Sequence, residues 1–81
     1  MKIPRDISAE KLIKLLKKFD YIQTRQTGSH IRLSSKFTGI HQHITISNHN
    51  PIKLGTLNNI LKDIAENLNL DKKDLIKKLF T

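Results

Sequence analysis

The side chains of this sequence that could carry out chemistry at neutral pH are its four histidines, which are His30, His41, His43 and His49. An imidazole with its ordinary pKa of about 6.5 can give or take a proton at neutral pH. The chain contains no cysteine, which excludes thiol nucleophiles, thiolate metal sites and disulfides. The patterns of phosphate-binding loops, dinucleotide-binding loops and GxSxG serine hydrolases are also absent. The sequence therefore favours proton transfer by histidine.

His30 stands apart from the other histidines because of the residues around it. It follows a predicted hairpin turn that contains Gly28 and Ser29, and it begins a segment in which polar and apolar residues alternate. If the apolar residues of this segment face a core, its polar residues share the other face of a strand. His30, Arg32 and Ser34 are then neighbours, which places an imidazole beside a guanidinium.

An imidazole beside cationic groups suits the cleavage of RNA, which supplies its own nucleophile in the ribose 2′-hydroxyl. Such cleavage needs proton transfer and positive charge around the reacting phosphate. Arg25, Arg32 and Lys36 are close to His30 in sequence and could supply that charge. On spacing alone, an ordinary histidine at the start of a strand is the favoured interpretation.

A metal site is the alternative use of the histidines. His41 and His43 are two residues apart on a predicted strand, so they could face the same way and bind a metal with His30 or His49. A catalytic zinc site usually has three protein ligands with carboxylate or carbonyl partners behind them, and no carboxylate is near these histidines. The sequence favours separate surface histidines, and we expect no metal and no cofactor.

The composition points to an anionic partner. The 81 residues include 15 Lys and Arg against 7 Asp and Glu, which gives a formal charge of +8 and an isoelectric point near 10.1. Nucleic acid is the obvious polyanion, although scattered lysines can also simply keep a small domain soluble. No apolar run approaches the roughly 18 residues that span a bilayer, and no signal peptide is evident. We expect a cytoplasmic protein with no membrane contact.

The periodicity predicts one α+β domain over residues 1–81, built as helix, three strands, helix and a short last helix. Ser8 can cap an amphipathic helix over residues 9–19, and Asp71 can cap the last helix. Three consecutive strands predict an antiparallel sheet with helices packed on one face. The predicted strands are residues 21–26, 30–34 and 43–46, and the long second helix begins around Leu54. The open face of the sheet would carry His30, Arg32, Ser34, His43 and Thr45.

Taken in order, these elements resemble the HicA toxin family of bacterial toxin–antitoxin systems. The likeness covers nearly the whole chain, and its most specific part is Gly28, Ser29 and His30 directly after the first strand. The motifs that carry it are the first helix, Arg25, the Gly28-Ser29-His30 turn, the His43 strand, His49-Asn50, and the helix that opens with Gly55-Thr56-Leu57. Family members usually have a glycine–aromatic pair where this chain has Asp20-Tyr21, and a proline where it has Ser47.

The resemblance implies a fold like that of double-stranded-RNA-binding domains. It also implies a ribosome-independent mRNA endonuclease (an mRNA interferase) that inhibits translation and growth, with His30 as the catalytic residue and a HicB-type antitoxin as the partner. Double-stranded-RNA-binding domains recognise RNA through phosphate and 2′-hydroxyl contacts, so a basic face on such a scaffold suits RNA. We expect the antitoxin to cover His30.

Two other functions fit the same charge and pattern. The first is a non-catalytic RNA-binding module of the same fold, in which His30 only contacts phosphate or base. The second is an interaction protein whose open sheet face or last helix serves only to dock a protein partner. Analysis of RNA products separates the first from an endonuclease, because only an enzyme shortens RNA.

Overall fold

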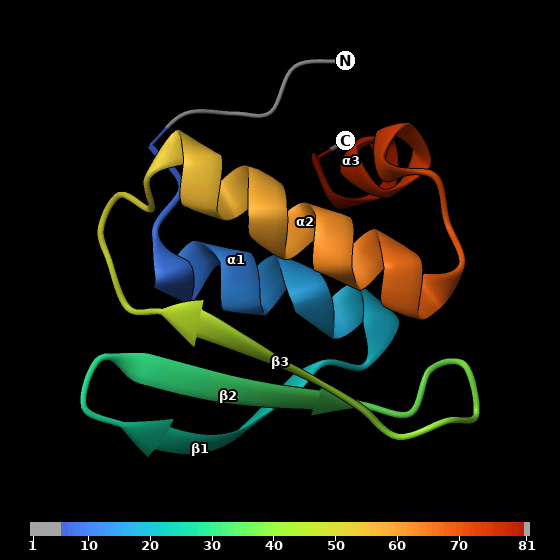
Figure 1. Ribbon diagram of the computed structural model, residues 1–81, viewed down its shortest axis with the longest axis horizontal. Coiled ribbons are helices and arrows are strands. Elements are labelled where there is room, and N and C mark those ends of the chain that lie inside the picture. The colour runs from blue at the N-terminus through green and yellow to red at the C-terminus, as the bar shows by residue number, and fades with distance from the viewer. Residues whose placement is uncertain (1–5, 81) are drawn as a thin grey trace.

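The computed structural model describes residues 6–80, which form a two-layer α+β structure with a three-stranded sheet below and helices above (Figure 1). The first and second helices lie on the same side of the sheet, and the lower face of the sheet in Figure 1 carries no helix. This is the α+β order that the periodicity predicts, and it is consistent with the double-stranded-RNA-binding-domain-like fold that the resemblance implies. The elements are α1 (Ala9–Leu16), the 3-10 turn η1 (Lys17–Phe19), β1 (Ile22–Thr27), β2 (His30–Ser35), β3 (Gln42–Ser47), α2 (Leu54–Leu68) and α3 (Lys72–Phe80).

Helix α1 begins as predicted but ends earlier. The Ser8 hydroxyl accepts a hydrogen bond from the backbone N–H of Lys11 at 3.1 Å and so caps the helix. The α-helix ends at Leu16, and Phe19 lies in η1. Asp20 then adopts a left-handed conformation with φ of 61°, which stops the helix. The predicted helical segment over residues 9–19 is thus confirmed as α1 followed by η1, and the strand begins at Ile22, one residue later than predicted. Tyr21 is a fully buried core residue before β1.

The sheet has the order β1–β2–β3, with both neighbouring pairs antiparallel. Ile31 pairs with Ile46 and Leu33 pairs with Ile44, and all four side chains are buried against the helices. The alternation predicted from the sequence is thus confirmed, and the polar residues between these four lie on the open face. On β2 and β3 the open face carries His30, Arg32, Ser34, His43, Thr45 and Ser47.

A β-bulge in β1 decides which way Arg25 faces. Gln23 pairs with Leu33 and Arg25 pairs with Arg32, so Thr24 is an extra residue on β1. In a regular ladder Arg25 would have paired with Ile31, whose side chain faces the helices. The extra residue instead places Arg25 directly opposite Arg32 on the open face.

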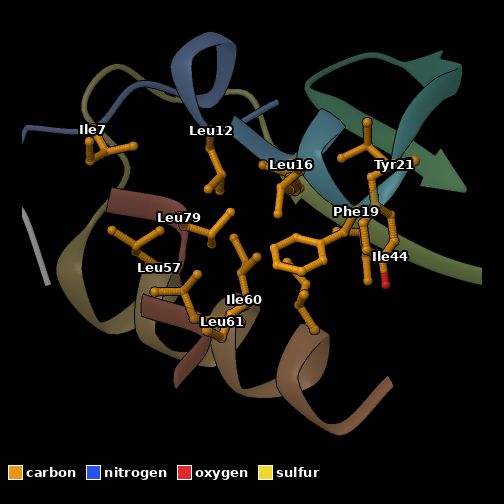
Figure 2. Packing of buried hydrophobic residues seen from close by; sticks show 14 of the residues in the cluster. Ile7, Leu12, Leu16, Phe19, Tyr21, Ile44, Leu57, Ile60, Leu61 and Leu79 are labelled. Carbon is orange, nitrogen blue, oxygen red and sulfur yellow. The ribbon is translucent and has the colours of Figure 1, made fainter. Parts of the chain in front are cut away.

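The core fills the space between the helices and the inner face of the sheet (Figure 2). Leu12 and Leu16 of α1 and Leu57 and Leu61 of α2 are at most 1% exposed. Helix α3 adds Leu79 to the same cluster, and it packs on both α1 and α2. The amphipathic pattern predicted for the first helix is therefore confirmed, and α2 likewise buries one apolar face.

Ser35 connects the end of η1 to the sheet from the inner side. Its side chain is 3% exposed, and its hydroxyl donates a 2.6 Å hydrogen bond to the carbonyl of Phe19. The same oxygen accepts a hydrogen bond from the backbone N–H of Phe37 at 3.1 Å. Ser34 and Ser35 thus occupy opposite faces of β2, one toward solvent-exposed polar partners and the other toward the core.

Candidate functional site

His30 is the first residue of β2 and lies at the end of the sheet that contains the β1–β2 turn, on the left in Figure 1. Gly28 and Ser29 form a two-residue turn, and Gly28 has φ of 57° at its first position, where a type II′ hairpin needs a positive φ. His30 pairs with Thr27 on one side and Ser47 on the other. These contacts fix the backbone at the base of an exposed imidazole.

The His30 side chain itself makes no hydrogen bond or ion pair with any residue from 6 to 80. Its two ring nitrogens are thus available to a ligand on the open face. Neighbouring backbone is tied down, since the N–H of Asn48 donates to the carbonyl of Ser29 at 2.6 Å. A firmly held backbone and an unengaged imidazole are compatible with proton transfer to a bound substrate.

The strongest electrostatic feature beside His30 is the pair formed by Arg25 and Arg32. The two arginines stand opposite each other across β1 and β2, both exposed, and like charges in this position destabilise a sheet. Neither arginine forms an ion pair with a carboxylate of residues 6–80, although Asp63 and Glu66 line a cavity together with Arg32. The open face therefore holds a concentration of positive charge that an anion would neutralise.

Lys36 lies away from this group. It follows the last residue of β2, six positions after His30, which corresponds to about 20 Å along a strand. It lines a separate cavity of about 570 Å³ with Lys17 and His41 at the other end of the sheet. Sequence proximity suggested that Lys36 assists at His30, and the extended conformation of β2 places the two residues at opposite ends.

A hydrogen-bonded serine–histidine pair lies between these two ends, and the sequence analysis did not identify it. The Ser34 hydroxyl and Nδ1 of His43 are 2.7 Å apart across β2 and β3. The ring of His41 packs against that of His43, with 4.4 Å between centroids. Cross-strand pairing could have suggested the contact, but only after the register of the two strands was known.

The environment of His43 favours its neutral form. Partial desolvation of the ring lowers the pKa of His43, and the positive charges of Arg32 and His41 lower that pKa further. His43 and Arg32 also line one cavity of about 430 Å³ at the β3 edge, where Asp63 and Glu66 of α2 form the opposite wall. At neutral pH the imidazole of His43 is thus an uncharged group beside a cation.

The structure brings His41 and His43 together but does not gather the four histidines. His43 lies opposite Ser34, four residues along β2 from His30, or about 13 Å. Between residues 6 and 80, no three His, Asp or Glu side chains are placed to hold a metal ion. No helix in the same stretch is long and apolar enough to cross a membrane.

A comparison with known families gives one match to this arrangement. The sequence pattern of the family described as the HicA toxin of bacterial toxin–antitoxin systems matches residues 9–65, which is more than half of the chain. The chain belongs to the HicA toxin family. Membership makes this HicA protein the toxin of a toxin–antitoxin system, whose partner is an antitoxin. Comparisons with curated proteins and with solved structures find no match.

The matched region contains every residue that the sequence analysis assigned to the site. It runs from the start of α1 into the last turns of α2, and includes the whole sheet with the Gly28-Ser29 turn and His30. Helix α3 lies outside the match, although Leu75 and Leu79 are fully or almost fully buried in the core. In this HicA chain α3 therefore extends the apolar cover over α1 and α2.

Proposed function

We propose that this HicA toxin is a ribosome-independent mRNA endonuclease, an mRNA interferase of the cytoplasm in which His30 acts as general acid or base. A single domain over residues 1–81 would carry the activity, with no metal or other cofactor. Cleavage of mRNA would then account for inhibition of translation and growth.

The observation that carries this proposal is the Arg25–Arg32 pair of like charges on the open face, two residues along β2 from His30. On β2, His30 and Arg32 are two residues apart on one face, so the bases of their side chains are about 7 Å apart. A phosphodiester that bridges the two arginines would neutralise their repulsion and lie within reach of the imidazole. This arrangement supports a site for an RNA backbone rather than for a neutral metabolite.

The chemistry that fits these residues is attack by a ribose 2′-hydroxyl on the adjacent phosphorus. The 2′-oxygen forms a bond to phosphorus, the bond from phosphorus to the 5′-oxygen breaks, the 2′-hydroxyl loses a proton and the leaving oxygen gains one. His30 would transfer one of these protons or both, and the arginines would stabilise the extra negative charge on the phosphoryl oxygens. Neutral histidine suits the first transfer and protonated histidine the second.

A non-catalytic RNA-binding module is the second candidate, and the absence of an orienting partner for His30 within residues 6–80 favours it. Catalytic histidines are often held by a second side chain. The two functions differ in their products, because a binding module would leave the RNA intact.

The antitoxin partner is proposed to be of the HicB type and to cover His30. The supporting observation is that His30 and both arginines are exposed on a sheet face without a helix over it (Figure 1). A protein that neutralises the toxin can do so by occupying this face with acidic side chains. A complex in which His30 stays open to solvent would contradict this expectation.

Expression in cells tests the proposed activity. Wild type and His30→Ala are placed under a tightly controlled promoter, and growth and total mRNA integrity are compared. We expect wild type to arrest growth and shorten mRNA, and the variant, at equal protein level, to do neither. Degradation of mRNA by His30→Ala would contradict the role given to His30.

A further inference from the structure

The Ser34–His43 pair is the best-defined polar contact on the open face that the proposed site does not use. Its 2.7 Å separation is short for a hydrogen bond between a hydroxyl and a ring nitrogen. Ser34 is 6% exposed, whereas His43 is exposed, so a buried hydroxyl holds a solvent-facing ring. The His41 ring contacts the same imidazole and restricts it further.

A short chain of hydroxyls continues from this hydrogen bond and is compatible with one direction for it. Thr24, the bulge residue of β1, has its hydroxyl 3.4 Å from the backbone carbonyl of Arg32 and 3.5 Å from the hydroxyl of Ser34. The carbonyl can only accept, so Thr24 donates its single proton there, and Ser34 donates to Thr24. In this arrangement Nδ1–H of His43 donates to Ser34, and we adopt this tautomer as part of the inference.

This assignment leaves Nε2 of His43 as a hydrogen-bond acceptor directed away from Ser34. The two nitrogens lie on opposite sides of the ring, and Nδ1 is occupied. The lowered pKa of His43 keeps Nε2 unprotonated at neutral pH. His43 lines a cavity of about 430 Å³ together with the cationic Arg32 and the acidic Asp63 and Glu66.

The mixed charges of this cavity define what it can bind. The acidic side chains disfavour a phosphate beside them but can accept hydrogen bonds from neutral donors, whereas Arg32 attracts a phosphate. A nucleoside with its phosphate toward Arg32 and its hydroxyl groups toward the acceptors satisfies both conditions. The ribose 2′-hydroxyl is the donor that distinguishes RNA from DNA.

We propose that His43, oriented by Ser34, accepts a hydrogen bond from a ribose 2′-hydroxyl and makes this HicA protein prefer RNA over DNA. The inference rests on the proposed function, since it assumes that the strand bound at His30 extends across the open face. His43 is about 13 Å from His30 along the strands, so it contacts a different nucleotide from the one that is cleaved. It is a specificity residue, and Ser34 is its positioning residue.

Binding of matched RNA and DNA tests this role separately from cleavage. The probes are two fluorescent single-stranded 12-mers of the same sequence, one of RNA and one of DNA, and the proteins carry His30→Ala to prevent cleavage. Fluorescence anisotropy at one fixed salt concentration gives the ratio of the two dissociation constants. We expect His43→Phe to weaken RNA binding about 2- to 10-fold, the range for one hydrogen bond, and to leave DNA binding unchanged.

His41→Phe is the matched control, because His41 is an exposed neighbouring histidine that makes no hydrogen bond to a serine within residues 6–80. It should leave the RNA-to-DNA ratio unchanged, and Ser34→Ala should reduce that ratio part of the way. Equal weakening of RNA and DNA by His43→Phe, or no change in either, would overturn the inference. If His30→Ala still shortens RNA on a denaturing gel, the proposed function fails, while the ratio is still read from the initial anisotropy.

Discussion

Replacing Ser35 with alanine should destabilise the fold without touching the open face. The Ser35 hydroxyl is the sole donor from residues 6–80 to the Phe19 carbonyl and also accepts from the N–H of Phe37. The residue Phe37 is 52% exposed, so its N–H can bond to water, whereas Phe19 is 6% exposed and its carbonyl loses its partner. Ser35→Ala removes two hydrogen bonds, each worth about 1 kcal/mol net, and most of the cost comes from the buried carbonyl. The free energy of unfolding should therefore fall by about 2 kcal/mol.

The measurement is the unfolding temperature of purified protein by circular dichroism. For a domain of this size 1 kcal/mol corresponds to roughly 4–8 °C, so Ser35→Ala should unfold about 8–16 °C below wild type. Ser34→Ala is the matched control, since both side-chain partners of Ser34, His43 and Thr24, are exposed and can bond to water. It should cost less than about 1 kcal/mol. Equal losses from the two serines would refute the reasoning from their opposite faces.

Three further outcomes follow from the charges and buried groups. Arg32→Gln should raise the pKa of His43 toward its ordinary 6.5, because it removes one of the positive charges that lower this pKa. The chemical shift of the His43 imidazole in an NMR titration measures the pKa. An unchanged titration midpoint would count against the interaction. Arg25→Gln in the His30→Ala background should weaken RNA binding and reduce the slope of log K against log salt concentration by about 0.7, the value for one phosphate contact on a single strand. It should not lower the unfolding temperature, because it relieves the repulsion from Arg32. An unchanged salt slope would remove Arg25 from the site. Burial raises the pKa of Tyr21 in the folded protein above its ordinary 10.0. The stability that this shift contributes is complete below about pH 10 and is lost as the pH rises through the pKa of the folded state. In alkaline denaturation above about pH 10, Tyr21→Phe should therefore lose less stability than wild type.

The layer arrangement could be predicted from the sequence because burial leaves a periodic pattern. Ile31 and Leu33 alternate with polar residues, and that alternation predicted the open face on which His30 and Arg32 lie. The change from α-helix to 3-10 helix after Leu16 could not be predicted in this way. Phe19 continues the helical spacing of apolar residues across that change, and the left-handed conformation of Asp20 then ends the helical segment.

The contacts within the site depended on strand register, which a single sequence does not determine. The bulge at Thr24 turns Arg25 toward Arg32, and nothing in the local sequence requires an extra residue at that point. The Ser34–His43 contact likewise requires the exact pairing of β2 with β3. Lys36 is close to His30 in sequence, but the extended strand between them separates the two residues in space.

The central claim is that His30 transfers protons during RNA cleavage, and the rate of cleavage by purified protein tests it most directly. Wild type, His30→Ala and the control His41→Ala are freed of antitoxin and incubated with the same end-labelled mRNA fragment under single-turnover conditions. General acid–base catalysis contributes roughly 10²- to 10⁴-fold, so His30→Ala should cut at least about 100 times more slowly while binding the RNA with similar affinity. His41→Ala should cut at the wild-type rate. Cleavage by His30→Ala at a rate close to wild type would contradict the account.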